Sequence, residues 1–137
     1  MKLLKEVEEI MDKYNLSVNI PSEYKNVYRY RDAHPNIVEE EFSHPEINDS
    51  FLINKYKNRI PMGWYGFAIG EPTPKNWFVV IDKILELLIK NDPSFEIYQI
   101  KMKYGGIRFY VGTSVIEDID EIEDLIDEKL FNEKLIY

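Results

Sequence analysis

The sequence contains no cysteine among its 137 residues. This absence excludes disulfide bonds, thiolate metal sites and a cysteine nucleophile. Small secreted domains usually carry disulfides, so we expect the protein to work in a reducing compartment, the cytoplasm. No apolar stretch approaches the length of a membrane span, and residues 1–6 lack the apolar core of a signal peptide. We therefore expect no contact with a membrane.

Known catalytic signatures are also absent. The chain has no GxxxxGK[ST] or GxGxxG phosphate loop, no GxSxG nucleophile turn and no HExxH zinc motif. Its two histidines, His34 and His44, each precede a proline in an expected turn, and their spacing matches no pattern of metal ligands. We predict a non-enzymatic protein with no catalytic residue, no metal and no cofactor. A hydrolase that uses carboxylates and a divalent metal is a further hypothesis, with no ligand spacing behind it.

Basic residues are in the minority. There are 17 Lys and Arg against 25 Asp and Glu, which gives a formal net charge of −8. Direct binding of nucleic acid is disfavoured, because neutralising phosphates requires a net supply of cations. The surplus of acids indicates either solubility alone or an acidic surface that docks on a basic partner.

What the sequence does have is enough apolar material for one core. It is 45% hydrophobic and 14% aromatic, and its length fits a single domain. Apolar residues at helical spacing predict three helices, over residues 2–14, 74–91 and 115–130. The second helix has a wide apolar arc and is expected to be central, with Thr73 as its N-cap and Pro74 at its first position.

A β-hairpin is expected over residues 96–112. The dipeptide Gly105-Gly106 suits the positive φ angles of a two-residue turn, which sets Lys103 directly opposite Arg108 and places Lys101 diagonally to both. One face is apolar and is expected to pack on the central helix: Ile100, Met102, Tyr104, Ile107, Phe109 and Val111. The other face is polar: Gln99, Lys101, Lys103, Arg108 and Tyr110.

The fold class that follows is α+β, as one domain over residues 1–137. The hairpin, joined by a short strand near residues 64–69, forms a small sheet packed against the helices. Residues 60–137 form the motif-bearing core, whereas residues 16–59 look irregular and are expected to carry partner-specific surface. Within them, residues 51–56 form either a short helix or a strand. The apolar end of the chain is expected to be a final strand or a docked tail.

Three groups of residues are candidates for binding. The cations Lys101, Lys103 and Arg108 beside Tyr110 suit a phosphate or carboxylate, because like charges facing each other on a sheet are destabilising without a ligand. The competing interpretation is that acids from elsewhere in the chain cover these charges.

The second and third groups suit a partner protein. Trp64 and Tyr65, in a glycine-rich segment, are candidate anchors, with core packing as the competing interpretation for Trp64 and for Phe67. Helix 115–130 carries eight acids that can steer association with a basic surface, or that form an ordinary solvated face. The acids chosen as candidate contacts are Asp120, Glu121 and Asp124.

Two segments carry a resemblance. The sequence MGWYGF at residues 62–67, followed by Pro74, and the sequence QIKMKYGGIRFYV at residues 99–111 resemble a group of small uncharacterised proteins from bacteria and their phages. Members of that group carry a Gly-Trp-Tyr-type segment and a hairpin of the form Q-[IV]-K-x-K-[FY]-G-G-[LI]-R-F-Y-V. The match covers about residues 60–112. The group has no established activity, but the resemblance implies a mobile or accessory gene.

The leading hypothesis is therefore a small acidic binding protein that inhibits a larger macromolecule with a basic surface. A phage counter-defence protein of the anti-CRISPR type, acting in the cytoplasm of an infected cell, fits this hypothesis, and an immunity protein against a bacterial toxin is an alternative. The second hypothesis is a binder of a small anionic or nucleotide ligand. In that case Lys101, Lys103 and Arg108 hold phosphate while Tyr110 or Trp64 stacks on a base.

Overall fold

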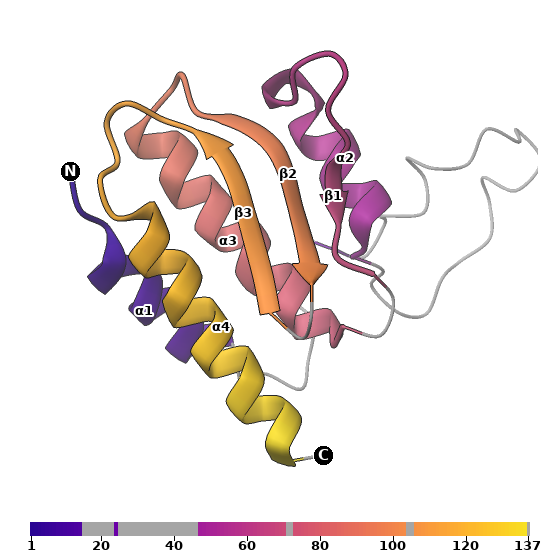
Figure 1. Ribbon diagram of the computed structural model, residues 1–137, viewed down its shortest axis with the longest axis vertical. Coiled ribbons are helices and arrows are strands. Elements are labelled where there is room, and N and C mark those ends of the chain that lie inside the picture. The colour runs from indigo at the N-terminus through magenta and orange to yellow at the C-terminus, as the bar shows by residue number, and fades with distance from the viewer. Residues whose placement is uncertain (15–23, 25–46, 71–72, 104–105, 137) are drawn as a thin grey trace, which may run out of the picture.

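The computed structural model describes residues 1–14, 24, 47–70, 73–103 and 106–136, with side chains as far as residue 129. Helices and a small sheet alternate along the chain, which confirms the α+β class of a single small domain (Figure 1). The elements in order are α1 (Leu4–Tyr14), α2 (Asp49–Tyr56), the 3₁₀ turn η3 (Lys57–Arg59), β1 (Gly66–Ala68), α3 (Lys75–Asn91), β2 (Glu96–Lys103), β3 (Gly106–Gly112) and α4 (Ile119–Ile136).

The sheet has three strands in the order β1-β2-β3 and is mixed. Strands β2 and β3 form the expected antiparallel hairpin, whereas β1 pairs parallel to β2 after a crossover through α3. Helix α3 lies across one face of the sheet, α1 packs against α3 and α4, and α4 runs beside β3 (Figure 1). Among the described elements no helix crosses the opposite face, which we call the open face; the face toward α3 is the covered face.

The core lies between α3 and the covered face. Ile97, Ile100 and Ile107 are fully buried there, and Phe109 is nearly so. They belong to one cluster with the apolar side of α3, whose Trp77 and Phe78 are also fully buried. The wide apolar arc of α3 explains this, because a helix that is apolar over most of its circumference must be covered on most sides.

The register of the hairpin differs from the sequence prediction. Lys103 pairs with Gly106, and Lys101 lies directly opposite Arg108, so the two-residue connection is 104–105 rather than 105–106. The physical reason is close packing at Gly106: a Cβ there would lie 3.0 Å from Asp127 Oδ1. The lack of a side chain at Gly106 therefore suits its contact with α4, and this glycine belongs to β3. The error moves the partners of residues 100–103 by two positions, and an even shift of this kind leaves side chains on their predicted faces.

Helix boundaries also differ from the predicted ones. Helix α3 begins at Lys75 with Pro74 as its N-cap, and the Thr73 hydroxyl donates to the carbonyl of Ile69 instead of capping the helix. Residues 51–56, predicted as either helix or strand, belong to α2, which Asn48 caps by accepting from the N–H of Phe51.

Helix α4 starts later and ends later than the predicted 115–130. The Thr113 hydroxyl accepts from the backbone N–H groups of Val115 and Ile116, which holds these residues in a turn before the helix. The expected final strand or docked tail is instead the end of α4, through Ile136.

Some predictions lie outside the described residues. These are His34, His44, Tyr104 and most of the irregular segment 16–59. None of the helices that the structure describes combines the length and the apolar character needed to cross a membrane.

A groove on the open face of the sheet

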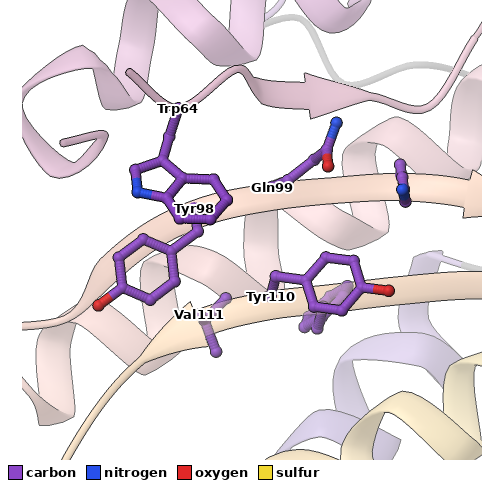
Figure 2. Close-up of a pocket in the computed structure, with 7 residues that line it drawn as sticks. Trp64, Tyr98, Gln99, Tyr110 and Val111 are labelled. Carbon is purple, nitrogen blue, oxygen red and sulfur yellow. The ribbon is translucent and has the colours of Figure 1, made fainter. Parts of the chain in front are cut away.

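The open face carries a groove of about 600 Å³ (Figure 2). Trp64, Tyr98, Gln99, Lys101 and Tyr110 line it. Phe109 and Val111 of β3 also border it, although Phe109 belongs to the core and Val111 packs against that core. Trp64 and Tyr98 lie together at one end, and Tyr110 lies toward the other (Figure 2). The volume falls within the range of about 300–1,000 Å³ typical of small-molecule sites.

A tight turn before β1 positions Trp64 at the groove. The N–H of Trp64 donates to the carbonyl of Pro61 at 3.1 Å, and Gly63 and Gly66 on either side adopt φ angles of 92° and 79°. At Gly66 a side chain would also collide with Ile60. The backbone turns at these glycines and then enters β1. Trp64, between them, is 50% exposed, and its ring lies over β2. The core interpretation holds for Phe67, which is buried, and not for Trp64.

A β-bulge in β2 brings Tyr98 to the open face. Ile97 pairs with Val111 and Gln99 with Tyr110, so Tyr98 is the extra residue. Its ring lies 5.1 Å from that of Trp64, between centroids, and its hydroxyl passes so close to Gly112 that a Cβ there would be 2.6 Å away. Simple alternation along β2 places Tyr98 on the same face as Ile100, which is why sequence reasoning missed it.

A cation lies at the Tyr110 end of the groove. The ammonium of Lys101 is 5.5 Å from the centroid of the Tyr110 ring, within the range of a cation–π interaction. Across the strands Lys101 faces Arg108, whose guanidinium lies 3.2 Å from Asp127 of α4. Within the described part of the chain Lys101 forms no ion pair. The groove therefore presents one cation that no described carboxylate balances.

Only some of the predicted site residues line the groove. Trp64, Lys101 and Tyr110 come together in the groove, whereas Lys103 and Arg108 do not line it. Tyr65 is 75% exposed next to it. The acids Asp120, Glu121 and Asp124 are exposed on α4, beside the β3 edge of the sheet and therefore at the opposite edge from β1. The two patches predicted to touch one partner protein are thus separate surfaces.

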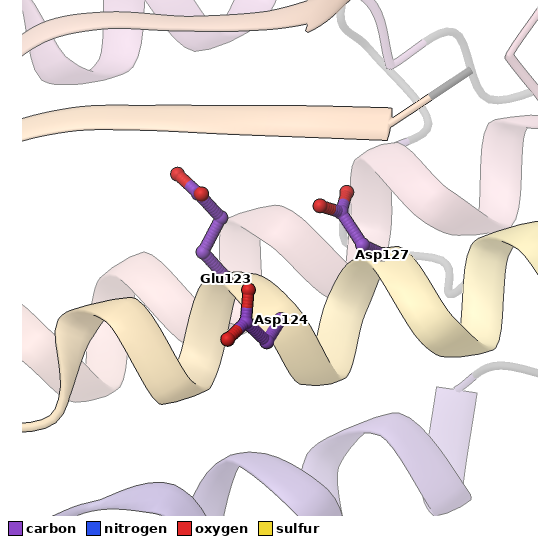
Figure 3. Close-up of side chains that lie close together, drawn as sticks. All are labelled: Glu123, Asp124 and Asp127. Carbon is purple, nitrogen blue, oxygen red and sulfur yellow. The ribbon is translucent and has the colours of Figure 1, made fainter. Parts of the chain in front are cut away.

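Not all acids of α4 face solvent. The carboxylate of Glu123 accepts from the N–H of Phe109 at 2.7 Å, and that of Asp127 accepts from the N–H of Ile107. These donors lie on the free edge of β3, which would otherwise offer unpaired N–H groups to another strand. Glu123 and Asp127, with Asp124, place three carboxylates within 4.8 Å of one another (Figure 3). Two of these three are occupied in covering the sheet edge.

Two further carboxylates accept hydrogen bonds from backbone N–H groups at the end of a helix or strand. Asp118 accepts from the N–H groups of Leu3 and Leu4 at the start of α1, at 2.9 Å for each N–H. Asp49, in the first turn of α2, accepts from the N–H groups of Ile69 and Gly70 after β1. Part of the acid surplus therefore serves the fold.

The most buried polar cluster is centred on Asp82 of α3, which is fully buried. The hydroxyls of Tyr24 and Tyr56 donate to its carboxylate, and the ammonium of Lys55 lies 2.9 Å from it. Burial, followed by the charge of Asp82, raises the pKa of Tyr56, which keeps this hydroxyl protonated. Burial opposes the charge of Lys55, but hydrogen bonds to Glu86 and Asp82 outweigh it and raise its pKa. The cluster holds its protons firmly and ties Tyr24 and α2 to α3.

Comparisons of the chain with protein-family models, with curated proteins and with solved structures found no match. The resemblance drawn from the Gly-Trp-Tyr segment and the hairpin therefore stays a prediction, and the function has to be argued from the site.

Proposed function

We propose that this protein is a non-enzymatic binding protein and that its binding surface is the groove on the open face. Exposed aromatic rings and one unbalanced cation suit a ligand that carries a planar group and a negative charge. The observation that supports this proposal is the convergence of Trp64, from the loop before β1, with Tyr98, Lys101 and Tyr110 of the β2–β3 hairpin. The cytoplasm is the compartment we propose, since a chain without cysteine suits a reducing environment.

The rings of the groove are unusual for an outer sheet surface. Monomeric proteins seldom leave large apolar groups clustered in the open, and such clusters commonly mark binding sites. Here Trp64 and Tyr110 are 50% and 44% exposed although the covered face offers a core in which aromatic rings pack. The exposed acids Asp120, Glu121 and Asp124 do not line this groove, so the proposal rests on the rings and on Lys101.

An experiment in which the ligand need not be identified beforehand tests this proposal. A bacterial extract is separated by ultrafiltration into a small-molecule filtrate and a macromolecular retentate, and each is added to isotopically labelled protein. We expect one fraction to shift the NMR signals of the Trp64 indole and of the Gln99, Lys101 and Tyr110 amides. Shifts confined to α4, or no shift with either fraction, would contradict the proposal.

A matched pair of variants locates the effect. Trp64→Ala removes a ring of the groove, whereas Met62→Ala changes a residue of the same loop that is wholly exposed and does not line the groove. The first variant is expected to lose the shifts and the second to keep them. Equal behaviour of the two would show that the groove is not the binding surface.

A second candidate function is inhibition of a larger macromolecule, as in phage counter-defence, or neutralisation of a toxin by an immunity protein. The exposed acids Asp120, Glu121 and Asp124 favour it, because surface acids steer association with a basic partner. In a pull-down, reversal of all three to lysine is expected to release a partner that wild-type protein retains at low salt. If the charge-reversed variant still retained the partner, the acids of α4 would not be part of the partner-binding surface.

A further inference from the structure

We infer that the groove holds a single nucleoside monophosphate, with its base against the Trp64–Tyr98 pair and its phosphate at Lys101. This inference rests on the proposed function and names the class of ligand. It differs from the inhibitor function in requiring a small molecule and no protein partner.

The aromatic end of the groove is built to accept a flat ring. Trp64 and Tyr98 are 5.1 Å apart and tilted by 41°, so each ring fixes the other. Two neighbouring rings of fixed orientation form a stacking surface whose order does not have to be imposed on binding. Stacking of a base on such side chains contributes about 1–3 kcal/mol per base. A planar heterocycle therefore gains more from this end of the groove than an aliphatic group does.

Gln99 supplies the polar contacts that a base needs. Its side-chain amide offers both donors and an acceptor, the combination that pairs with the edge of a nucleobase. Gln99 lies in β2 directly after the bulge residue, and Figure 2 shows its amide on the side of β2 where Trp64 lies. A ring stacked on Trp64 thus has its edge within the range of a side chain that can hydrogen-bond to it.

The charge pattern suits one phosphate. Lys101 is half-buried in the groove and makes only the contact with Tyr110 among the interactions found in the described residues. Its neighbour across the strands, Arg108, is balanced by Asp127. A ligand with one anionic group completes this arrangement, because it gives Lys101 the counter-ion that Arg108 already has in Asp127.

The same pattern argues against a nucleic-acid strand. A polymer carries a phosphate at every nucleotide, and its affinity depends on several cations along its path. Here the chain has a net charge of −8, and helix α4, which carries the exposed acids Asp120, Glu121 and Asp124, runs beside β3. A strand that leaves the groove over β3 meets like charge, whereas a monomer does not.

The test compares ligands that share parts of the same molecule. Calorimetric titrations use AMP, CMP, adenosine, inorganic phosphate and a single-stranded decanucleotide. We expect the monophosphates to bind about tenfold or more tightly than adenosine, since a charge-assisted contact is lost in the nucleoside. Inorganic phosphate is expected to bind more weakly than either monophosphate. NMR provides the location, because the protein has two tryptophans and only the Trp64 indole signal is expected to shift.

Variants separate the two halves of the ligand. Lys101→Met is expected to make AMP and adenosine bind equally, and Trp64→Ala to weaken the binding of both. Trp64→Phe keeps an aromatic ring and is expected to retain binding, and the NMR spectrum of Trp64→Ala shows whether that variant is folded. Met62→Ala is the control and leaves every affinity unchanged. A preference for AMP that survives Lys101→Met would overturn the placement of the phosphate.

The remaining outcomes are equally decisive. If the decanucleotide bound more tightly than the monophosphates, with a steep dependence on salt, the ligand would be a nucleic-acid strand and not a single nucleotide. Equal affinities for inorganic phosphate and AMP would show that the base does not contribute to binding. If no nucleotide shifts the Trp64 signal while a fraction of the cell extract does, this inference is wrong and the proposed binding function stands. If neither shifts it, both are wrong.

Discussion

The two faces of the sheet use similar side chains for opposite purposes. On the covered face Ile97, Ile100 and Ile107 are fully enclosed against α3, together with Phe109. On the open face Trp64 and Tyr110 keep about half of their surface in water although their rings are large and mostly apolar. The difference indicates that the covered face accounts for the stability of the domain, while the open face is free to serve binding.

The carboxylates also fall into two groups, those that accept hydrogen bonds within the fold and those that are exposed to solvent. Asp82, Glu123 and Asp127 accept hydrogen bonds from buried or edge groups of the fold. Asp120, Glu121 and Asp124 are exposed on the same helix as two of these, and sequence spacing alone does not separate the two kinds. Residues that look interchangeable in the sequence are therefore expected to differ sharply when they are substituted.

The largest effect is expected at Asp82. Asp82→Ala removes the acceptor of two tyrosine hydroxyls and the counter-ion of Lys55, and breaking a buried pair in this way costs about 3–5 kcal/mol. Denaturant unfolding of the variant measures the loss. The matched change Asp124→Ala on the surface of α4 is expected to stay within about 0.5 kcal/mol. Similar losses for the two variants would contradict the division of the carboxylates.

The same cluster makes the stability depend on alkaline pH. The pKa of Tyr56 is raised in the folded state above its usual value of 10.0, so its contribution is complete below pH 10 and is lost as the pH rises beyond that. The unfolding free energy should fall by up to about 1.4 kcal/mol per pH unit from this group. In Tyr56→Phe the decline should be shallower by that amount, although this variant is less stable at neutral pH. Parallel declines in the two proteins would show that Tyr56 does not titrate on unfolding.

The next effect compares the two faces directly. Ile100→Ala, on the covered face, leaves a cavity under α3 and is expected to cost about 2–5 kcal/mol of unfolding free energy. Tyr110→Ala, on the open face of the neighbouring strand, is expected to cost less than about 1 kcal/mol and to weaken ligand binding. Urea unfolding of both variants gives the comparison. A loss at Tyr110 as large as that at Ile100 would mean that the open face is also part of the core.

These contrasts show what the sequence could and could not predict. The hairpin and the central helix were predictable because their apolar residues repeat with the period of their secondary structure. The short strand near residues 64–69 was predicted from the glycines that punctuate an aromatic segment, and not from a period. The face of each hairpin side chain was predictable as well, since it depends on that period alone. The register was not, because Gly106 is explained by a contact with Asp127, twenty-one positions later in the sequence.

The groove shows the same limit. Lys101 and Tyr110 were predicted in one candidate site and Trp64 in another, and the nucleotide hypothesis joined them by letting Tyr110 or Trp64 stack on a base. Nothing local in the sequence indicates the pairing of β1 with β2 that brings them together. Tyr98 was missed because the bulge at that position reverses the alternation. A tyrosine beside two other exposed rings would have been detectable only with the strand pairing known.

A smaller effect is expected where α4 covers the edge of β3. Glu123→Ala removes the acceptor for the N–H of Phe109 and is expected to cost about 1–3 kcal/mol, because that donor is partly buried. Glu123→Gln keeps an acceptor oxygen and should recover most of the loss. Hydrogen exchange of the Phe109 amide is the specific measurement: it should accelerate in the alanine variant and not in Asp124→Ala. Unchanged exchange would show that the carboxylate does not protect this edge.

The smallest effect has the opposite sign. Lys101 faces Arg108 across the strands, and like charges in that position destabilise a sheet. Lys101→Glu turns the pair into one of opposite charge, so the variant is expected to be more stable than the wild type by about 0.2–1 kcal/mol. The gain should shrink at high salt, because the side chains are partly exposed and their interaction is screened. Urea unfolding at two salt concentrations measures it.

The same substitution should abolish binding of an anionic ligand, since it puts an acid in place of the only cation among the described residues that line the groove. Stability and binding would then move in opposite directions at one position, which is expected where a residue is retained for function at a cost to the fold. Lys103→Glu is the comparison, because Lys103 lies on the same strand but faces Gly106 and does not line the groove. If Lys101→Glu destabilised the domain, the repulsion with Arg108 would already be relieved within the protein, and the case for a bound anion would lose its energetic basis.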